Sequence, residues 1–354
     1  MITVKKEDFL SAIKAVKTSI GKLDLQPVLS TIHLKSENGG LVLTATDLEM
    51  SARAICEANI TEPIDVCINA NNLENIVSIL KDFITLDVQE GIVKIKSGKT
   101  YYDVLFIQSE EFPTIEFNLN AENKIVLDKD CFISGVNKAS ISAASEASNI
   151  LSGVCFTFTK DSYELASTDG NRLSQVKFDT PLDIEGQFVI PKKILLDVAK
   201  NVQNEVEIYL NNTTIIFKTG MKLFKQNLLN GTFPKYNQLI PTTFEHKAII
   251  EKSKLLSALE KVAIMSDERT NITVFDFNKK DLHLTTSCDC GKAEDTIEID
   301  FNSEIKIAFN YKYMLEGIKA MQTDKIMFGI NNPTSGCMVK GDFNYLIMPM
   351  QIKE

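Results

Sequence analysis

The sequence predicts an α+β protein in which one domain, built from two helices packed on antiparallel sheets, occurs three times. The first observation is a set of near-identical tetrapeptides at equal spacing: LSAI at 10–13, ISGV at 133–136 and LSAL at 256–259. Two further landmarks keep the same period: LTATD at 43–47 with LASTD at 165–169 and, more weakly, LTTSC at 284–288, and FPTI at 112–115 with FPKY at 233–236 and MPM at 348–350. A period of about 120 residues is the size of a whole domain and is far too long for a solenoid unit. We therefore predict three domains at 1–119, 120–242 and 243–354.

The first repeat alternates helices with hairpins. Phe9, Leu10, Ile13 and Val16 have helical spacing and predict a helix over 7–20. A second helix is predicted over 71–81 by the same periodicity. The segment NGG at 38–40 predicts a tight turn between two strands. Strands are predicted at 31–35, 41–46, 48–54, 86–88, 92–96 and 101–107.

The second and third repeats give the same order of elements. Pro191 suits the first turn of a helix, where its missing N–H costs nothing. Helices are predicted at 129–139, 191–202, 253–265 and 311–321. Strands are predicted at 155–159, 162–166, 172–178, 206–210, 214–218, 224–229, 272–277, 282–286, 293–299, 325–330, 337–340 and 345–348.

Bulk composition places the chain among globular proteins. Hydrophobic residues make up 44% of its 354 residues, and no stretch approaches the length of a membrane helix. The first residues lack the apolar region of a secretory signal. The 7 cysteines form no regular framework, so we expect free thiols in a reducing cytosol and a cytoplasmic location.

Charge is distributed unevenly along the chain. The net charge is −9, which argues against a simple basic nucleic-acid binder, yet lysine outnumbers Asp and Glu in the six predicted helices. One interpretation is that lysine, a good helix former, covers a solvated face. The other is a basic inner surface that attracts phosphates without sequence preference. Counting residues does not decide between the two.

Taken together, these landmarks resemble a known family, the beta subunits of bacterial DNA polymerase III, which are replicative sliding clamps. The resemblance runs along the whole chain. It rests on TDLEM at 46–50, STDGNRL at 167–173, FPKY at 233–236 and YLIMPM at 345–350. No single motif is specific, but their order on a threefold period is.

The resemblance implies a ring and a non-catalytic function. Two chains would join head to tail, placing six domains around duplex DNA with the helices lining the hole. Such a clamp would be loaded by an ATP-dependent clamp loader and would confer processivity on the polymerase, with no cofactor or metal. The implied DNA-facing residues are Lys14, Lys17, Lys22, Lys138, Lys193, Lys200, Lys254 and Lys261. The implied dimer interface includes Tyr102, Ile264 and Met265, for which burial within their own domains is the alternative.

The resemblance also implies a pocket for short peptides from replicative and repair polymerases, the clamp loader and other partners. Methionine suits such a pocket because its flexible thioether adapts to varied apolar side chains. Asn171 and Gln238 depart from the residues common in the family, His and Arg, and this affects peptide preference. The implied pocket residues are Leu151, Thr168, Gly170, Asn171, Arg172, Leu173, Pro234, Gln238, Leu239, Tyr313, Leu346, Ile347, Met348, Pro349 and Met350.

Two alternatives accompany these pocket residues. The segment DGN at 169–171 is also typical of a tight turn, and we expect both a turn and a pocket wall. The methionines at 348 and 350 are equally compatible with ordinary core.

Catalytic and metal-binding patterns are weak in this sequence. None of the 3 histidines belongs to a Ser/His/Asp or Cys/His pattern, and no Walker-type phosphate loop occurs. His283, Cys288 and Cys290 resemble a metal cluster but lack a second ligand pair, and the adjacent Asp289 and Gly291 predict a turn. Two hypotheses stand beside the sliding clamp: a monomeric scaffold that binds peptides but no DNA, and a hydrolase using Asp169.

Overall fold

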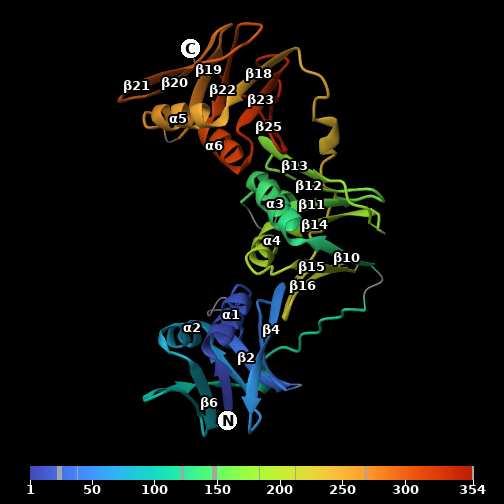
Figure 1. Ribbon diagram of the computed structural model, residues 1–354, viewed down its shortest axis with the longest axis vertical. Helices are drawn as coiled ribbons and strands as arrows, with labels where there is room; N and C mark the ends of the chain where they lie inside the picture. The colour runs from blue at the N-terminus through green and yellow to red at the C-terminus, as the bar shows by residue number, and fades with distance from the viewer. Residues whose placement is uncertain are drawn as a thin grey trace. The chain divides into compact units, whose positions relative to one another are not determined.

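The computed structural model describes residues 1–21, 26–37, 39–120, 123–145, 150–182, 184–211, 213–267 and 269–352 (Figure 1). The chain divides into two compact units. Unit 1 combines Met1–Phe132 with Lys193–Leu228, and unit 2 combines Ile133–Lys192 with Leu229–Glu354. Each unit therefore joins one terminal repeat with part of the central repeat. Among the described residues, no helix is long and apolar enough to cross a membrane.

Unit 1 is built on a 13-stranded sheet. The helices α1 (Lys6–Lys17) and α2 (Ala70–Ile79) lie wholly in this unit, as does all of α4 (Lys192–Ala199) after its first residue. The strands are β1 (Ile2–Lys5), β2 (Thr31–Glu37), β3 (Gly40–Thr46), β4 (Met50–Ile60), β5 (Asp65–Asn69), β6 (Phe83–Gln89), β7 (Ile92–Ser97), β8 (Thr100–Leu105), β9 (Ile107–Gln108), β10 (Asn123–Asp128), β15 (Glu205–Leu210), β16 (Thr214–Thr219) and β17 (Lys222–Asn227).

Unit 2 has an 8-stranded and a 4-stranded sheet. Its helices are α5 (Lys252–Ala263), α6 (Tyr311–Ala320) and most of α3 (Lys129–Ala139). The strands are β11 (Gly153–Phe158), β12 (Tyr163–Thr168), β13 (Arg172–Phe178), β14 (Gly186–Pro191), β18 (His246–Glu251), β19 (Ile272–Phe277), β20 (Asp281–Cys288), β21 (Gly291–Glu298), β22 (Ile305–Asn310), β23 (Lys325–Ile330), β24 (Cys337–Lys340) and β25 (Asn344–Ile347).

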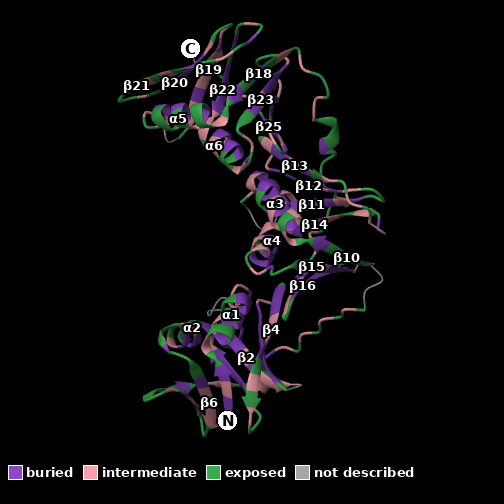
Figure 2. Cartoon of the chain, viewed as in Figure 1, coloured by how far each residue is buried: buried purple, intermediate pink, exposed green. Residues whose placement is uncertain are grey.

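The order of elements confirms the predicted threefold repetition. Each repeat runs strand, helix, four strands, helix, three strands, from β1 to β8, from β10 to β17 and from β18 to β25. Each helix buries one face (Figure 2). In α1, Phe9, Ile13 and Val16 are buried while Lys14 is exposed. Side-chain caps begin three of the helices: Asn69 accepts from the Asn72 amide at 3.1 Å, Asp128 from the Cys131 amide at 3.0 Å and Asn310 from the Lys312 amide at 3.0 Å. The fold is therefore α+β, as predicted.

Six strands escaped prediction, and each leads directly into a helix: β1, β5, β10, β14, β18 and β22. No loop separates strand from helix, so the apolar period changes from 2 to 3.6 without a turn signal. The assignment of Pro191 to the first turn of a helix is corrected for the same reason. Pro191 is the last residue of β14, paired with Gly153, and α4 begins at Lys192.

The sheets continue from one repeat into the next. In unit 1, β17 of the central repeat pairs antiparallel with β4 of the first, with Gln226 opposite Met50. In unit 2, β25 of the third repeat pairs with β13 of the central repeat, with Ile347 opposite Arg172. Because strand pairing crosses from repeat to repeat, the boundaries at 119 and 243 stay predictions.

Candidate partner-peptide site

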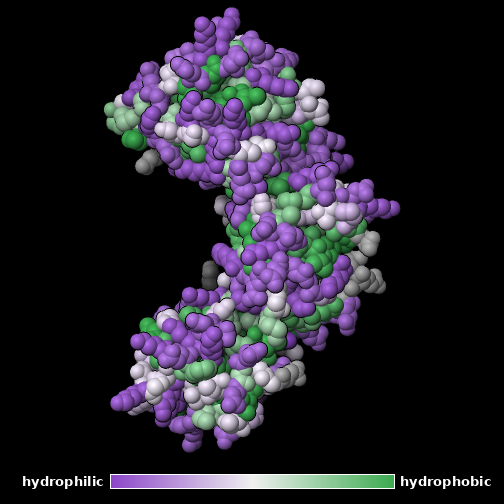
Figure 3. Space-filling view, in the orientation of Figure 1, coloured by the Kyte–Doolittle hydropathy of each residue, from purple (hydrophilic) through white to green (hydrophobic). Residues whose placement is uncertain are grey.

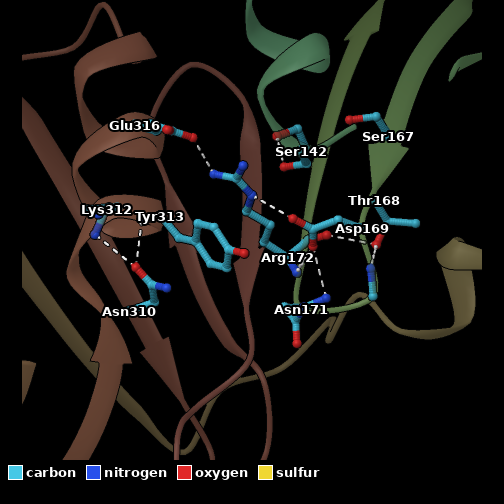
Figure 4. A network of polar contacts seen from close by, with 12 residues as sticks. Ser142, Ser167, Thr168, Asp169, Asn171, Arg172, Asn310, Lys312, Tyr313 and Glu316 are labelled. Atoms are coloured by element: carbon cyan, nitrogen blue, oxygen red, sulfur yellow. Dashed lines mark hydrogen bonds and ion pairs between the residues drawn. The ribbon is translucent and has the colours of Figure 1, made fainter. Parts of the chain in front are cut away.

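The site is organised by the turn at residues 168–172, which joins β12 to β13 (Figure 4). Thr168 Oγ1 donates to the carbonyl oxygen of Arg172 at 2.7 Å and accepts from the Gly170 amide at 3.1 Å. Asp169 Oδ1 accepts from the amides of Asn171 and Arg172 at 2.9 and 3.1 Å. Gly170 has a φ of 89°, a left-handed conformation that glycine adopts without steric cost. The expected tight turn is therefore confirmed.

Arg172 links this turn to helix α6. Its Nε donates to Asp169 Oδ2 at 3.0 Å and its Nη1 to Glu316 Oε2 at 2.5 Å. The guanidinium also lies over the ring of Tyr313, 4.0 Å from its centre (Figure 4). Only 9% of the Arg172 side chain is exposed, so two carboxylates and an aromatic face hold a largely desolvated charge.

A cleft of about 720 Å³ opens beside this network. Four predicted pocket residues line it: Leu151, Asn171, Arg172 and Tyr313. The remaining lining residues are Ile141, Ala143, Ala144, Ser145, Asp169, Lys192 and Glu316. Burial and the nearby Arg172 lower the pKa of the Lys192 ammonium. The cleft thus carries charged groups on one wall and small apolar side chains on another.

An apolar cluster continues from the cleft. Leu173, Leu346, Phe233, Tyr236 and Met338 are among its buried members, and Leu151 packs against it while also lining the cleft. Two further predicted pocket residues are exposed, Leu239 at 59% and Met348 at 42%. The Met348 amide donates to the Asn171 carbonyl oxygen at 2.8 Å, which joins the C-terminal segment to the turn. The site therefore combines a buried apolar floor with exposed apolar side chains.

The remaining predicted pocket residues differ in exposure. Pro234 and Gln238 are exposed, Thr168 is buried in the turn, and Pro349 and Met350 are half-buried. The side chain of Ile347 is fully buried opposite Arg172, and those of Leu173 and Leu346 are buried in the apolar cluster. The alternative that the two methionines belong to the core does not hold for the exposed Met348.

Sequence reasoning predicted Tyr313 on α6 but missed Glu316 on the same helix and Lys192 at the start of α4. Glu316 and Lys192 lie far from the turn in sequence, and no local motif connects them to Arg172. The sequence offered one signal: Arg172 directly precedes a strand with apolar residues. An arginine in such a position is expected to be buried and then needs an anionic partner. Asp169, the candidate for hydrolysis, is engaged by two backbone amides and the Arg172 guanidinium, which explains it as a turn-forming residue.

Most of the predicted DNA-facing lysines lie exposed on helices or at helix ends. Lys14, Lys193, Lys200, Lys254 and Lys261 are exposed. The face of the molecule drawn in Figure 3 is mostly hydrophilic. Lys17 is half-buried and pairs with Glu74 at 2.5 Å. Lys22 lies outside the described residues.

Lys138 corrects the expectation. Its side chain is 9% exposed and its ammonium lies 2.6 Å from the carboxylate of Asp342, so it is already paired and unavailable to a phosphate. Lys138 Nζ also donates to Ser134 Oγ on the same helix at 2.6 Å. The helical pattern gave no indication of this, because Asp342 comes from a distant turn of the third repeat.

The predicted interface residues lie beside two strands at the ends of their sheets. Strand β8, which carries the half-buried Tyr102, ends the path of the 13-stranded sheet, and β21 ends the 4-stranded sheet. Ile264, at the end of α5, is 82% exposed. Tyr101 and Leu105 on β8 are also exposed, at 60% and 77%. Exposed apolar residues beside an open strand edge mark a surface for association.

Metal ligands do not gather among the residues that the structure describes: no group of three or more His, Cys, Asp or Glu side chains could hold an ion there. His283 instead meets Thr296 and Asp281, while Cys288 and Cys290 meet each other.

Comparison with known proteins gives one consistent family. Models of the DNA polymerase III beta subunit match in chain order: the N-terminal domain at residues 1–116, the central domain at 126–235 and the C-terminal domain at 237–351. The beta sliding clamps of Synechococcus elongatus and Pseudomonas aeruginosa are each 25% identical, with 99% of both chains covered.

Solved structures show the same fold. The DNA polymerase III beta subunit of Thermotoga maritima has a TM-score of 0.94 at 21% identity and covers 100% of both chains. The sliding clamp of Pseudomonas aeruginosa bound to griselimycin has a TM-score of 0.93 at 24% identity and covers 99% of both chains. Three domain matches in order, spread over nearly the whole chain, leave one conclusion: this chain belongs to the family of DNA polymerase III beta subunits.

Proposed function

We propose that the protein is a non-catalytic sliding clamp, a closed ring of two chains that encircles duplex DNA and tethers the replicative polymerase. The observation that carries this proposal is the pairing of strands between successive repeats. The last strand of the second repeat pairs with the first repeat, and the last strand of the third pairs with the second. By the same rule, β8, the last strand of the first repeat, would pair with the third repeat of another chain.

The repeat also gives the register of this joint. Met50 and Arg172 begin β4 and β13 and lie opposite Gln226 and Ile347. The equivalent residues of the joint are Gly291, which begins β21, and Val104 of β8. An antiparallel pair in this register puts Lys292 opposite Asp103 and Ala293 opposite Tyr102. Opposite charges directly across a strand pair are favourable, which supports the head-to-tail arrangement.

The exposed helical lysines would contact the phosphate backbone. Such contacts carry no sequence information and weaken with salt, so they permit sliding. In a closed ring, topology rather than adhesion retains the clamp on DNA, and a few lysines suffice in an otherwise acidic protein. Opening and loading would need an ATP-dependent clamp loader, and the place of action would be the bacterial cytoplasm.

The cleft and its apolar floor would bind short peptide segments of polymerases, the clamp loader and repair proteins. Exposed Leu239 and Met348 offer flexible apolar contacts, and Lys192 offers positive charge to a peptide carboxylate. The family includes a clamp solved with griselimycin bound. A disordered segment that orders on docking fits a site of this shape.

Retention on closed and cut DNA tests the proposal. The protein, loaded by a clamp loader and ATP on nicked circular DNA, should stay bound through gel filtration and dissociate when a restriction enzyme linearises the circle. Ile264→Lys places a charge on the joint without disturbing a core, and it should give a one-chain sedimentation mass and no retention.

Two results would overturn the ring. Equal retention of the wild-type protein on circular and linear DNA would show adhesion instead of encirclement. A wild-type sedimentation mass of one chain, with peptide binding but no loader-dependent retention, would support the monomeric scaffold.

A further inference from the structure

The turn that Thr168 and Asp169 form in the second repeat has a counterpart in the third repeat with different chemistry. Residues 287–291 read SCDCG and join β20 to β21. Cys288 stands where Asp47 and Asp169 stand in the first two repeats, and Cys290 stands where Glu49 and Asn171 stand. A pair of thiols therefore replaces the side chains of a turn that carboxylates stabilise elsewhere in the molecule.

The hairpin holds these two thiols against each other. Cys288 is paired with Gly291 in the β20–β21 ladder, so only Asp289 and Cys290 make the turn. The two Sγ atoms lie 2.6 Å apart. Cys290 is exposed and Cys288 is half-buried, so a reagent in solution can reach the pair.

The other described cysteines provide an internal contrast. Cys56, Cys67, Cys155 and Cys337 are buried, and Cys131 is half-buried on α3. Burial raises the pKa of the Cys56, Cys67 and Cys155 thiols to about 12. Hydrogen bonds from the Cys290 thiol and from the backbone amides of Cys290 and Gly291 lower the pKa of Cys288. The thiolate that attacks a disulfide is therefore easiest to form at Cys288.

We propose that Cys288 and Cys290 are a reversible redox site that forms a disulfide within the β20–β21 turn. The oxidant is a low-molecular-weight disulfide such as oxidised glutathione. The Cys288 thiolate attacks one sulfur of the oxidant and releases one thiolate, leaving a mixed disulfide. The Cys290 thiolate then attacks Cys288 Sγ and releases the second. One S–S bond forms, two thiol protons pass to solvent, and two electrons reduce the oxidant.

The small covalent loop that this disulfide closes makes the disulfide reversible. A disulfide between residues two apart closes a strained loop, and this disulfide would be exposed to solvent. Strained or exposed disulfides have higher reduction potentials and are the labile, regulatory ones. A reducing cytosol would keep the pair as thiols, and oxidative conditions would close it.

The position of the turn gives the modification a consequence, which rests on the proposed ring joint. Gly291, the first residue of β21, packs so closely on Met265 that a Cβ there would lie 2.7 Å from Met265 Cε. Met265 and the exposed Ile264 are predicted interface residues. In the first two repeats the carbonyl oxygens of Glu49 and Asn171 accept from Asn227 and Met348 of the paired repeat. Cys290 offers the equivalent carbonyl oxygen at the proposed joint. A disulfide between Cys288 and Cys290 would therefore weaken the joint.

Intact mass measurement of the full chain tests the redox site. Incubation of the native protein with oxidised glutathione should remove two hydrogens, and peptide mapping should place the bond between residues 288 and 290. Cys131→Ser, the control at the other half-buried cysteine, should behave like wild type. Cys288→Ser and Cys290→Ser should form no disulfide and should instead carry a glutathione adduct on the remaining cysteine of the pair. No mass loss in the wild type, or the same loss in Cys288→Ser, overturns the proposal.

Sedimentation of the same samples separates this proposal from the ring. Reduced protein should sediment as a dimer. The dissociation constant of the dimer should be about tenfold higher for the oxidised protein, and a thiol reductant should restore the original value. If the reduced protein sediments as one chain, the ring joint fails while the mass result still decides the disulfide. If the oxidised protein dimerises as tightly as the reduced protein, the link between this disulfide and the joint is overturned.

Discussion

The turns of the first and second repeats share one hydrogen-bonded frame but present different surfaces. In the first, Thr46 Oγ1 donates to the Met50 carbonyl oxygen at 3.0 Å and accepts from the Leu48 amide at 3.0 Å. Asp47 Oδ1 accepts from the amides of Glu49 and Met50 at 3.1 and 2.6 Å. Each of these bonds recurs in the turn at residues 168–172.

The side chains on that frame differ. Leu48 and Gly170 both have positive φ, 76° and 89°, but only Leu48 carries a side chain there. Met50, 2% exposed, occupies the place of Arg172, and Asp47 lies 3.8 Å from Lys193 instead of bonding an arginine. In both repeats, Thr-Asp therefore builds the same turn. The turn of the second repeat also carries the paired Arg172 beside the cleft, and we propose that peptide binding depends on this difference.

The largest expected difference between the two turns is in peptide binding. Replacing Met348 and Met350 by Ala should weaken binding of a clamp-binding peptide by at least about tenfold, because the apolar surface that the peptide would bury is lost. The matched change at the turn of the first repeat is Asn227→Ala, in the strand of the central repeat that pairs with that turn. Asn227 donates to Glu49 as Met348 donates to Asn171, and this variant should bind peptide as wild type does.

Fluorescence anisotropy with a labelled peptide measures these affinities, and sedimentation should show an unchanged dimer for both variants. Unchanged affinity in the Met348 and Met350 double variant would reject the pocket assignment. Weakened binding in Asn227→Ala would show that the first turn also binds peptides.

A second difference lies in the two aspartates. Asp169→Ala should lower the free energy of unfolding by about 2–3 kcal/mol, because it removes two turn hydrogen bonds and leaves Arg172 with one carboxylate fewer in a largely buried site. Asp47→Ala should cost about 1 kcal/mol, since it removes the turn bonds alone. Urea unfolding measures both.

The asparagine variants separate the two contributions. Asp47→Asn retains a side-chain acceptor for the turn amides and should be nearly neutral. Asp169→Asn keeps the turn but loses the charge opposite Arg172. Equal costs for Asp47→Ala and Asp169→Ala would mean that the arginine network adds nothing to stability.

The smallest expected effects come from exchanging the residues at positive φ. Leu48→Gly should stabilise by about 0.5–1 kcal/mol, since relief of a left-handed leucine outweighs the added freedom of the unfolded chain. Gly170→Leu should destabilise by about 1 kcal/mol for the opposite reason. Leu48 is 57% exposed, so its removal sacrifices little core. Thermal unfolding of the two variants should therefore shift in opposite directions, and shifts of the same sign would contradict this account.

The helices were predicted correctly because the apolar residues of the sequence recur with the period of the helix. The six helices were found because apolar residues recur on one face, as Phe9, Ile13 and Val16 do in α1. The six strands before the helices were missed because a strand that passes directly into a helix leaves no turn between them. Strand β5, for example, ends at Asn69, whose side chain caps α2. A short strand joined to a cap looks like part of the helix or of a loop.

The repeated motifs predicted several residues that the structure brings together at the cleft, but contacts between distant segments could not be predicted from them. Arg172, Asn171 and Tyr313 were expected in the site and do line the cleft. Glu316 was not expected, although it holds Arg172, because the pair is separated by 144 residues. Lys138 was placed on a DNA-facing surface for the same reason: its partner Asp342 is invisible in the helical pattern.

The sequence by itself determined the threefold repeat, the α+β class and the family, because these depend on periodicity and on motifs that lie within a few residues. The tertiary structure decided which charged side chains form ion pairs, as Lys138 and Arg172 show. It also showed that strands pair from one repeat to the next and leave β8 and β21 at sheet ends. Electrostatic pairing and sheet edges depend on which distant segments meet, and that is fixed only when the whole chain has folded.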